Sequence, residues 1–376
     1  MSGALINLVS KGVQDAFITG DPQVSFFRQN YKRHTNFAMK PVEINGIGVN
    51  APGAQLTFKV ENKGDLLTGV WLDLGPEGDV GAYDSAVVPP QPADDMIITN
   101  PERVPTRVEL WVGGKMIDSQ DAFYGGILYP SFLAPTHAKT WLPESAITSG
   151  GGNNYYPLHF FHCDNATTPL PLVALQYQEV EIRVIQSPHV GASYANINHK
   201  IRMFAEYVQL DTTERQWFTE QPHDMLITQV QRIQAGGSGS DLIYLNHPVK
   251  TLMWGLYGND TTDIQLYVNG TQYFNTPMNQ NYFTCISSYY HSPNSEYAAK
   301  GGRGGNLSGG MAMFPFALDV SSHQPTGTLN FSRVDNAKLT WGNGSGGDAK
   351  DPLFLYAVNY NIFRIESGMG GVRFSN

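Results

Sequence analysis

The sequence predicts an all-β chain in which one sandwich-like fold occurs twice. The 376 residues include 39 Gly and 23 Pro, and aromatic residues reach 12% against only 15% charged residues, which favours short strands joined by turns. Turn signals recur about every 8 to 12 residues through most of the chain, as in a β-sandwich or barrel. In addition, Pro171–Val184 is echoed by Leu353–Ile365 near the C-terminus, which indicates a duplication.

The two echoing segments share an irregular spacing of apolar residues. Tyr177 of the first aligns with Tyr360 of the second, and up to these positions both segments alternate as a strand does. Beyond them the parity of the apolar positions changes in both, which indicates a β-bulge or a strand that changes face. We therefore expect each segment to be the last strand of its half, with the alternation broken near Gln178 and near Asn361.

Two further pairs of segments support the duplication. Val108–Val112 alternates and runs into two glycines, while Ile264–Val268 alternates in the same way and runs into an Asn-Gly pair. Two residues that can adopt positive φ close a β-hairpin, so each segment is expected to form one. The strand-like runs around Trp71 and Trp254 make the second pair. Chance similarity between hairpins is the alternative explanation.

The length predicts two domains, because a single core stops growing at roughly 250 to 300 residues. Each half of the chain is long enough to bury a core of its own. The expected divisions are an N-terminal segment at 1–20, a first β domain at 21–204, a helical bridge at 205–222 and a second β domain at 223–376.

The bridge carries the clearest helix signal in the middle of the chain. Asp211 is followed three residues later by Glu214, a pattern that resembles a capping box. A helix is therefore predicted over Thr212–Thr219, and Pro222 is expected to end it, with strands resuming at Met225.

The N-terminal region combines a helix signal with a cluster of basic residues. Asp21 followed by Pro22 predicts an N-cap with proline at the first helical position, and so a short helix through Phe27. The basic cluster that follows consists of Arg28, Lys32, Arg33 and His34. It is either a patch for nucleic acid or an anionic membrane surface, or a set of subunit-contact or solvated residues.

The overall charge and the cysteines exclude several classes of protein. A net charge of −9 argues against a general nucleic-acid binder, whose binding energy comes from neutralising phosphates. Cys163 and Cys285 are the only cysteines, which is no disulfide framework and suits a reducing compartment. The sequence shows no signal peptide and no run of 18 apolar residues, so we expect neither secretion nor a membrane span.

Motifs for catalysis or metal binding are weak. The sequence has no nucleophile elbow, HExxH, CxxC or P-loop pattern. The run His159–Cys163 could offer metal ligands, but on a strand residues three apart point to opposite faces, so a structural role is favoured. Lys300–Gly310 is read as a flexible loop, and Asp94 and Asp95 have no partner acid. No catalytic, cofactor or metal site is therefore predicted.

Six stretches spread over nearly the whole chain resemble one family, the major capsid proteins of nucleocytoplasmic large DNA viruses. They are Val13–Phe37, Pro171–Ile182, Glu206–Arg215, Asn246–Trp254, Gln324–Leu339 and Tyr356–Asn376.

The resemblance implies a double jelly-roll fold, with two tandem eight-stranded antiparallel jelly rolls joined by the helical bridge. It implies a non-enzymatic structural protein of the virion that forms homotrimeric, pseudo-hexagonal capsomers in an icosahedral shell, made and assembled in the host cytoplasm. Expected partners are neighbouring capsomers, minor capsid proteins and an internal viral membrane, with no sequence-specific nucleic acid and no cofactor. The N-terminal segment is expected to face the particle interior, and the long loops to form outer towers.

A different function remains as the alternative. A two-domain carbohydrate-binding or glycan-cleaving β-sandwich would also give this strand pattern, and Trp141, Tyr155 and Tyr156 are aromatic residues that could contact a sugar.

Overall fold

The computed structural model describes residues 12–29, 31–49, 51, 53–74, 105–136, 139, 155–186, 201–234, 240–255, 262–293, 311–342 and 354–374. The chain divides into two compact units, Met1–Asn36 and Phe37–Asn376.

The first unit contains a short helix, α2 (Asp15–Thr19), which lies upstream of the predicted one. Gly12 N donates to Asp15 Oδ2 at 3.0 Å and so closes its first turn. The prediction of a helix beginning after Asp21 is wrong. Asp21 has a positive φ of 46°, whereas an N-cap residue needs extended backbone. The described residues after α2 form no further helix or strand in this unit.

The second unit begins with the strands of the first roll. In chain order these are β1 (Phe37–Ile44), β2 (Gly46–Ile47), β3 (Gln55–Val60), β4 (Leu66–Asp73), β5 (Arg107–Val112), β6 (Lys115–Asp121), β7 (Tyr155–Pro157), β8 (Leu170–Pro171), β9 (Val180–Ile185) and β10 (Arg202–Leu210). One sheet has the order β1-β10-β4-β7 with β8 added on β4, and the other has the order β2-β3-β9-β5-β6.

The second roll repeats this arrangement. Its strands are β11 (His223–Gln234), β12 (Ser240–Ile243), β13 (Pro248–Gly255), β14 (Thr262–Val268), β15 (Thr271–Gln272), β16 (Met311–Pro315), β17 (Leu329–Asn330), β18 (Ala337–Gly342), β19 (Phe354–Glu366) and β20 (Met369–Val372). Its sheets run β11-β19-β13-β16 and β12-β18-β14-β15. With the short strands β2, β8, β17 and β20 set aside, both rolls have the same connectivity, that of an eight-stranded jelly roll. The predicted double jelly roll is confirmed.

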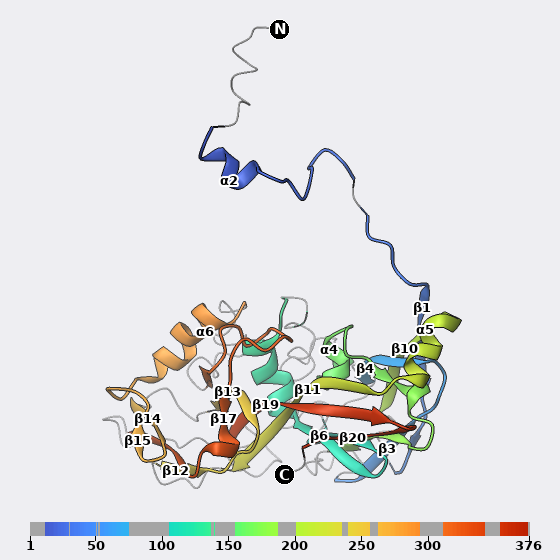
Figure 1. Cartoon of the computed structure of the whole chain (residues 1–376). Coiled ribbons are helices and arrows are strands. Elements are labelled where there is room, and N and C mark those ends of the chain that lie inside the picture. Colours follow the sequence, from blue (N-terminus) through green and yellow to red (C-terminus); the bar gives the residue numbers. More distant parts are fainter. Residues whose placement is uncertain are drawn as a thin grey trace. The chain divides into compact units, whose positions relative to one another are not determined.

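Helices are short and connect the strands (Figure 1). In the described part of the second unit they include the π-helix η2 (Tyr124–Leu133), α4 (Phe161–Asp164), the 3₁₀ turn η3 (Leu172–Ala174), α5 (Thr212–Glu220), the π-helix η5 (Tyr282–Ile286), α6 (Ser287–His291) and the 3₁₀ turn η6 (Phe331–Arg333).

Two of the three predicted strand pairs occupy equivalent places in the two rolls. The Trp71 and Trp254 strands are β4 and β13, and the hairpin strands are β5 and β14. The third pair is not equivalent. Pro171–Val184 is broken into β8, η3 and β9, whereas its supposed partner is the single strand β19.

The last strand of the first roll is therefore β10, not the segment at Pro171–Val184. In the first roll, β8, η3 and β9 follow one another, and the second roll repeats this sequence as β17, η6 and β18. Burial alternates strictly in both β9 and β18, as expected for strands with one face on the core. The break near Gln178 is present, but it is a gap between two elements rather than a bulge within a strand.

β19 itself carries no bulge near Asn361. The register between β19 and β11 runs without a shift from Phe354 to Ile365. On its other side the register with β13 does shift opposite Asn359, but the extra residue, Lys250, belongs to β13. The apolar positions change parity for another reason. Both faces of β19 are buried from Leu355 to Asn361, and beyond that point burial alternates.

The bridge contains the predicted helix, α5, but is shorter than expected. Asp211 is its N-cap, and its Oδ1 accepts the N–H of Thr212 at 2.8 Å. The boundary predicted at residue 204 falls inside β10, which continues to Leu210 and pairs with β1 and β4. The structured bridge is thus confined to α5 and the residues that flank it.

Each roll buries a core, but the core of the first roll is shared between the rolls. The core of the second roll is made of second-roll residues such as Leu252 and Leu339. The core of the first roll includes Ile227, Phe363 and Ile365, which belong to β11 and β19 of the second roll. In return η2 packs against Met253 and Met313 of the second roll. In Figure 1 the long strands β11 and β19 extend from the second roll to the first. Each half therefore has a core, as expected, but the two rolls share the first of these cores, and Phe37–Asn376 forms one unit.

Candidate functional site

The predicted basic residues all lie in the first unit. Arg28, Lys32, Arg33 and His34 are exposed, and the described backbone around them forms no helix or strand. His34 Nδ1 lies 2.7 Å from the carbonyl oxygen of Thr35. The structure keeps the four residues close in sequence but does not arrange them around a described cavity.

Large apolar side chains accompany the basic residues. Phe26, Phe27 and Tyr31 are 91%, 100% and 79% exposed, and Phe17 of α2 is 91% exposed. The first unit thus exposes large apolar side chains close in sequence to its basic residues.

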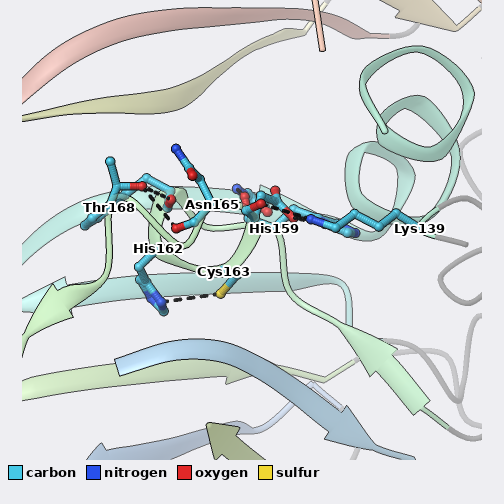
Figure 2. Close-up of polar contacts among 9 residues, drawn as sticks. Lys139, His159, His162, Cys163, Asn165 and Thr168 are labelled. Atoms are coloured by element: carbon cyan, nitrogen blue, oxygen red, sulfur yellow. Dashed lines mark hydrogen bonds and ion pairs between the residues drawn. The ribbon is translucent and has the colours of Figure 1, made fainter. Parts of the chain in front are cut away.

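The run His159–Cys163 forms the most polar buried cluster that the sequence singled out (Figure 2). It is not a strand, because His159 is in a loop and α4 begins at Phe161, so the strand argument used for these residues is wrong. His162 Nδ1 donates to the carbonyl oxygen of Thr68 at 2.8 Å, and Cys163 Sγ lies 3.5 Å from the same nitrogen.

Asp164 is the centre of the other half of this cluster. Its Oδ1 lies 3.4 Å from His159 Nδ1 and 3.6 Å from Lys139 Nζ, and Lys139 also donates to its carbonyl oxygen at 3.0 Å. The ring of Tyr129, from η2, stacks on His159 with centroids 3.7 Å apart. Burial opposes ionisation of Asp164, but His159 and Lys139 outweigh it and hold its pKa below the usual value.

The electrostatics of the cluster do not favour catalysis. Burial lowers the pKa of His162 to about 4, so the ring is neutral at physiological pH. Burial likewise raises the pKa of the Cys163 thiol, which is the opposite of the shift that activates a nucleophilic cysteine. Among the described residues no group of three His, Cys, Asp or Glu side chains could hold a metal ion. The contacts instead tie η2, Lys139 and α4 to β4.

The aromatic residues considered for sugar binding are not gathered into a platform within the described residues. Tyr156 is 3% exposed and belongs to the core, while Tyr155 is 47% exposed. Trp141 lies outside the described residues, as do Asp94, Asp95 and the glycine-rich segment Lys300–Gly310.

A shallow groove lies beside α5, lined by Lys63, Asp65, Leu172 and Arg215, among others. Arg215 Nε is 2.9 Å from Asp65 Oδ1, and Asp65 Oδ2 accepts the N–H of Leu210 at 2.8 Å. The charged side chains of Asp65 and Arg215 therefore pair with each other and join α5 to the first roll. Within the described part of the chain, no helix is long and apolar enough to cross a membrane.

Sequence reasoning missed Asp118 and Asp121. Both lie on β6 and accept hydrogen bonds from the second roll, Asp118 from Val230 N at 2.9 Å and Asp121 from Tyr356 Oη at 2.6 Å. In the sequence, Lys115–Asp121 looks like a solvated strand, and no local signal distinguishes its buried carboxylates from exposed ones.

Comparisons with known families match both rolls. Residues 25–211 match the model described as the major capsid protein N-terminus, and residues 257–371 match that of the large eukaryotic DNA virus major capsid protein. The major capsid protein of Pyramimonas orientalis virus is 32% identical, and that of Paramecium bursaria Chlorella virus 1 is 28% identical. Both alignments cover 100% of each chain.

Solved structures agree with the fold. A chain of the quasi-atomic PBCV-1 virus capsid matches with a TM-score of 0.71 at 23% identity, covering 94% of this chain and 100% of that one. The Faustovirus major capsid protein matches with a TM-score of 0.64 at 11% identity, covering 95% of both. The chain belongs to the major capsid proteins of nucleocytoplasmic large DNA viruses, and its role is that of a structural capsid subunit.

Proposed function

We propose that this chain assembles as a homotrimer into a pseudo-hexagonal capsomer of an icosahedral shell. The observation that carries the proposal is the pair of rolls with identical connectivity, joined by a shared core. Each chain supplies two rolls of the same connectivity in one compact unit. A threefold axis repeats them into six similar parts, which give the capsomer a pseudo-hexagonal outline. A closed trimer of this outline can tile a surface through repeated side contacts.

Composition supports self-association. Only 15% of the residues are charged, while 12% are aromatic. Protein interfaces are depleted of Lys, Glu and Asp and enriched in aromatic residues at their centres, because unpaired charge is costly to bury. The same side contacts would join neighbouring capsomers in the shell.

Light scattering on the purified protein tests the trimer. A trimer has a mass of about 124 kDa, three times the 41.4 kDa of one chain. Electron micrographs of the same sample are expected to show pseudo-hexagonal particles. A monomer that stays monomeric at high protein concentration would contradict the proposal.

The first unit is proposed to act as an inward contact element. Its exposed basic residues, Arg28, Lys32 and Arg33, lie beside exposed aromatic residues. This combination suits contact with a minor capsid protein or with the internal viral membrane, since basic and aromatic groups together favour anionic interfaces.

Charge neutralisation separates this contact from trimer formation. Replacing Arg28, Lys32 and Arg33 by Gln is expected to impair particle assembly and to leave the trimer intact. Replacing the exposed Lys40 and Lys115 by Gln serves as the control, because these residues belong to the second unit. Normal assembly of the triple variant would refute an inward role for the cluster.

The proposed role involves no catalysis and no cofactor. A glycan-binding function would need an exposed aromatic platform, and burial of Tyr156 removes one of its three candidate residues. The proposed location is the virion shell, with synthesis and assembly in the host cytoplasm. Binding of the purified protein to a glycan array, lost on Trp141→Ala, would favour the alternative instead.

A further inference from the structure

Each roll carries a helical segment at the same place in its chain order. In the first roll this segment is η2, which follows the hairpin strand β6. In the second roll it is η5 continued directly by α6, which follows the hairpin strand β15. The two segments have the same length, because η2 has 10 residues and η5 and α6 have 5 each. Aligned end to end, Tyr124 falls on Tyr282 and Leu133 on His291.

Positions that are buried in η2 are exposed in the second segment. All ten residues of η2 are buried. In the η5–α6 segment, Ile286, Tyr289 and Tyr290 are 47%, 69% and 70% exposed. Residues three and four apart lie on the same side of a helix, so these three form one apolar face. The η2 residues aligned with them are, in order, Leu128, Ser131 and Phe132.

The second roll covers η2. It does so with the outer face of its β11-β19-β13-β16 sheet, the face that points away from the core of its own roll. Tyr124 of η2 stacks on Tyr356 of β19, with ring centroids 6.2 Å apart. Ser131 Oγ lies 3.6 Å from the sulfur of Met311 on β16. Met253 of β13 belongs to the same cluster.

The first roll has an equivalent sheet face. Leu72 of β4 lies in the core of its roll, as Trp254 of β13 does in the other. The residues before them, Trp71 and Met253, therefore hold equivalent outer positions, since neighbours along a strand point to opposite faces. The register of the adjacent strands extends the equivalence from Phe204 to Tyr356 and from Tyr155 to Met311.

This equivalent face is aromatic and partly exposed. Trp71 and Phe204 are half-buried, and their rings stack with centroids 6.0 Å apart. Neither belongs to the core of the first roll. Tyr155 is 47% exposed. At the border of the face Arg202 pairs with Asp73, so these two opposite charges compensate each other. We call the surface of Trp71, Phe204 and Tyr155 the Trp71 face.

We propose that the η5–α6 segment of one subunit docks on the Trp71 face of a second copy of this chain. The helical segment and the sheet face each occur twice, but within one chain only η2 and the face of the second roll are joined. The remaining segment and the remaining face are both apolar and exposed, as expected of surfaces that another molecule covers. The inference rests on the proposed trimer and names its subunit contact.

The contact is head-to-tail, because the docking segment and the Trp71 face lie on different rolls. Head-to-tail contacts form a ring where the rotation between copies closes, and a filament where it does not. In a trimer, three chains of two rolls each would place a helical segment on a sheet face at every junction between rolls. A closed ring of this kind leaves neither surface open for a further copy.

The edge contact beside η2 is not repeated between copies. Within the chain, the edge strand β6 holds the edge strand β11, where Asp118 Oδ1 accepts the N–H of Val230 at 2.9 Å. The position of β1 that is equivalent to Val230 is Pro41, by the registers of β1 with β10 and of β11 with β19. Proline has no N–H to donate. Side chains of the η5–α6 segment and of the Trp71 face must therefore carry the contact.

Charge placed on the docking segment tests the contact in the full-length protein. Tyr289→Glu combined with Tyr290→Glu is expected to raise the dissociation constant of the trimer by about a hundredfold or more, since central aromatic residues dominate protein interfaces. Light scattering over a dilution series measures this change. Both side chains are exposed in the single chain, so folding should be unaffected. Tyr244→Glu is the matched control, because Tyr244 is 74% exposed and lies outside the segment.

A cross-link identifies the face of the second copy. Ser131 contacts Met311 within the chain, so the aligned Tyr289 is expected to lie beside Tyr155 of the neighbouring copy. In a Cys285→Ser background, chains with Tyr289→Cys and chains with Tyr155→Cys are co-expressed and treated with a short bis-maleimide. A covalent dimer is expected from the mixture and not from either variant alone. Pairing Tyr289→Cys with Tyr244→Cys should give none.

The outcomes distinguish this contact from the trimer itself. If the double Glu variant remains a trimer at wild-type dilutions, the docking is overturned and the trimer stands. Absence of the cross-link in a trimeric protein has the same meaning. A wild-type protein that is monomeric at high concentration refutes both the docking and the trimer.

Discussion

Phe363 offers the sharpest test of the shared core. It belongs to β19 of the second roll, yet it is fully buried in the core of the first, where its ring centroid lies 5.8 Å from that of Phe161. Replacing a fully buried Phe by Ala costs about 3 to 5 kcal/mol, from lost burial and from the cavity left behind. Phe363→Ala is therefore expected to lower the free energy of unfolding of both rolls by this amount.

Urea denaturation, followed by hydrogen exchange in β3 of the first roll and in β13 of the second, measures the effect. Because the rolls share a core, both strands are expected to lose protection together, in one transition shifted to lower urea. Phe374→Ala is the matched control. Its side chain is 53% exposed, so its loss should change stability by less than about 1 kcal/mol.

The result that would refute the shared core is a split transition. If β3 lost protection in Phe363→Ala while β13 kept its wild-type midpoint, the rolls would be independent folding units. Equal effects of Phe363→Ala and Phe374→Ala would also contradict the burial argument.

Three further predictions follow. Gly368 and Gly114 both have positive φ, of 79° and 77°, but a Cβ at Gly368 would lie 2.6 Å from the ring of Tyr177, whereas at Gly114 it would meet open space. In thermal melts Gly368→Ala should therefore destabilise the protein more than Gly114→Ala, by about 1 to 3 kcal/mol. Tyr356→Phe removes a hydrogen bond to the buried carboxylate of Asp121 and should lower the free energy of unfolding in urea by about 1.5 to 3 kcal/mol. An unchanged free energy of unfolding would show that water satisfies the hydroxyl instead. Burial keeps His162 neutral with a pKa of about 4, so the free energy of unfolding should fall by about 3 kcal/mol as the pH drops from 6.5 to 4. If His162→Gln lost as much stability in acid as the wild type, protonation of His162 would be excluded as the cause.

Composition and turn spacing predicted an all-β chain, and the resemblance to a known family supplied the double jelly roll. Local alternation identified β5 and β14 as equivalent strands. These signals are local, because an edge hairpin with one face on a core carries its pattern in its own sequence. The helix α5 was found for the same reason, since Asp211 caps it through a neighbouring N–H.

The predictions failed where contacts between distant parts of the chain determine which residues are buried. Up to Asn361, β19 is buried on both faces, because Leu355 and Ala357 lie in the core of the second roll while Tyr356 and Val358 pack with η2 of the first. This removed the alternation on which the bulge prediction relied. Likewise, Asp118 and Asp121 look like solvated residues of a strand until β11 is placed beside them. The positive φ of Asp21 removed the predicted N-terminal helix.

The bridged edges of β6 and β11 have a consequence for the pool of unassembled chains. An open strand edge invites backbone pairing with any other chain, which leads to amorphous aggregation rather than to ordered lattice growth. Where β6 and β11 face each other, Asp118 and Gln229 join the two edges, and β1, an edge strand of the first roll, carries Pro41, which cannot donate to an added strand. At these three edges backbone pairing with another chain is disfavoured, while association through side chains stays open.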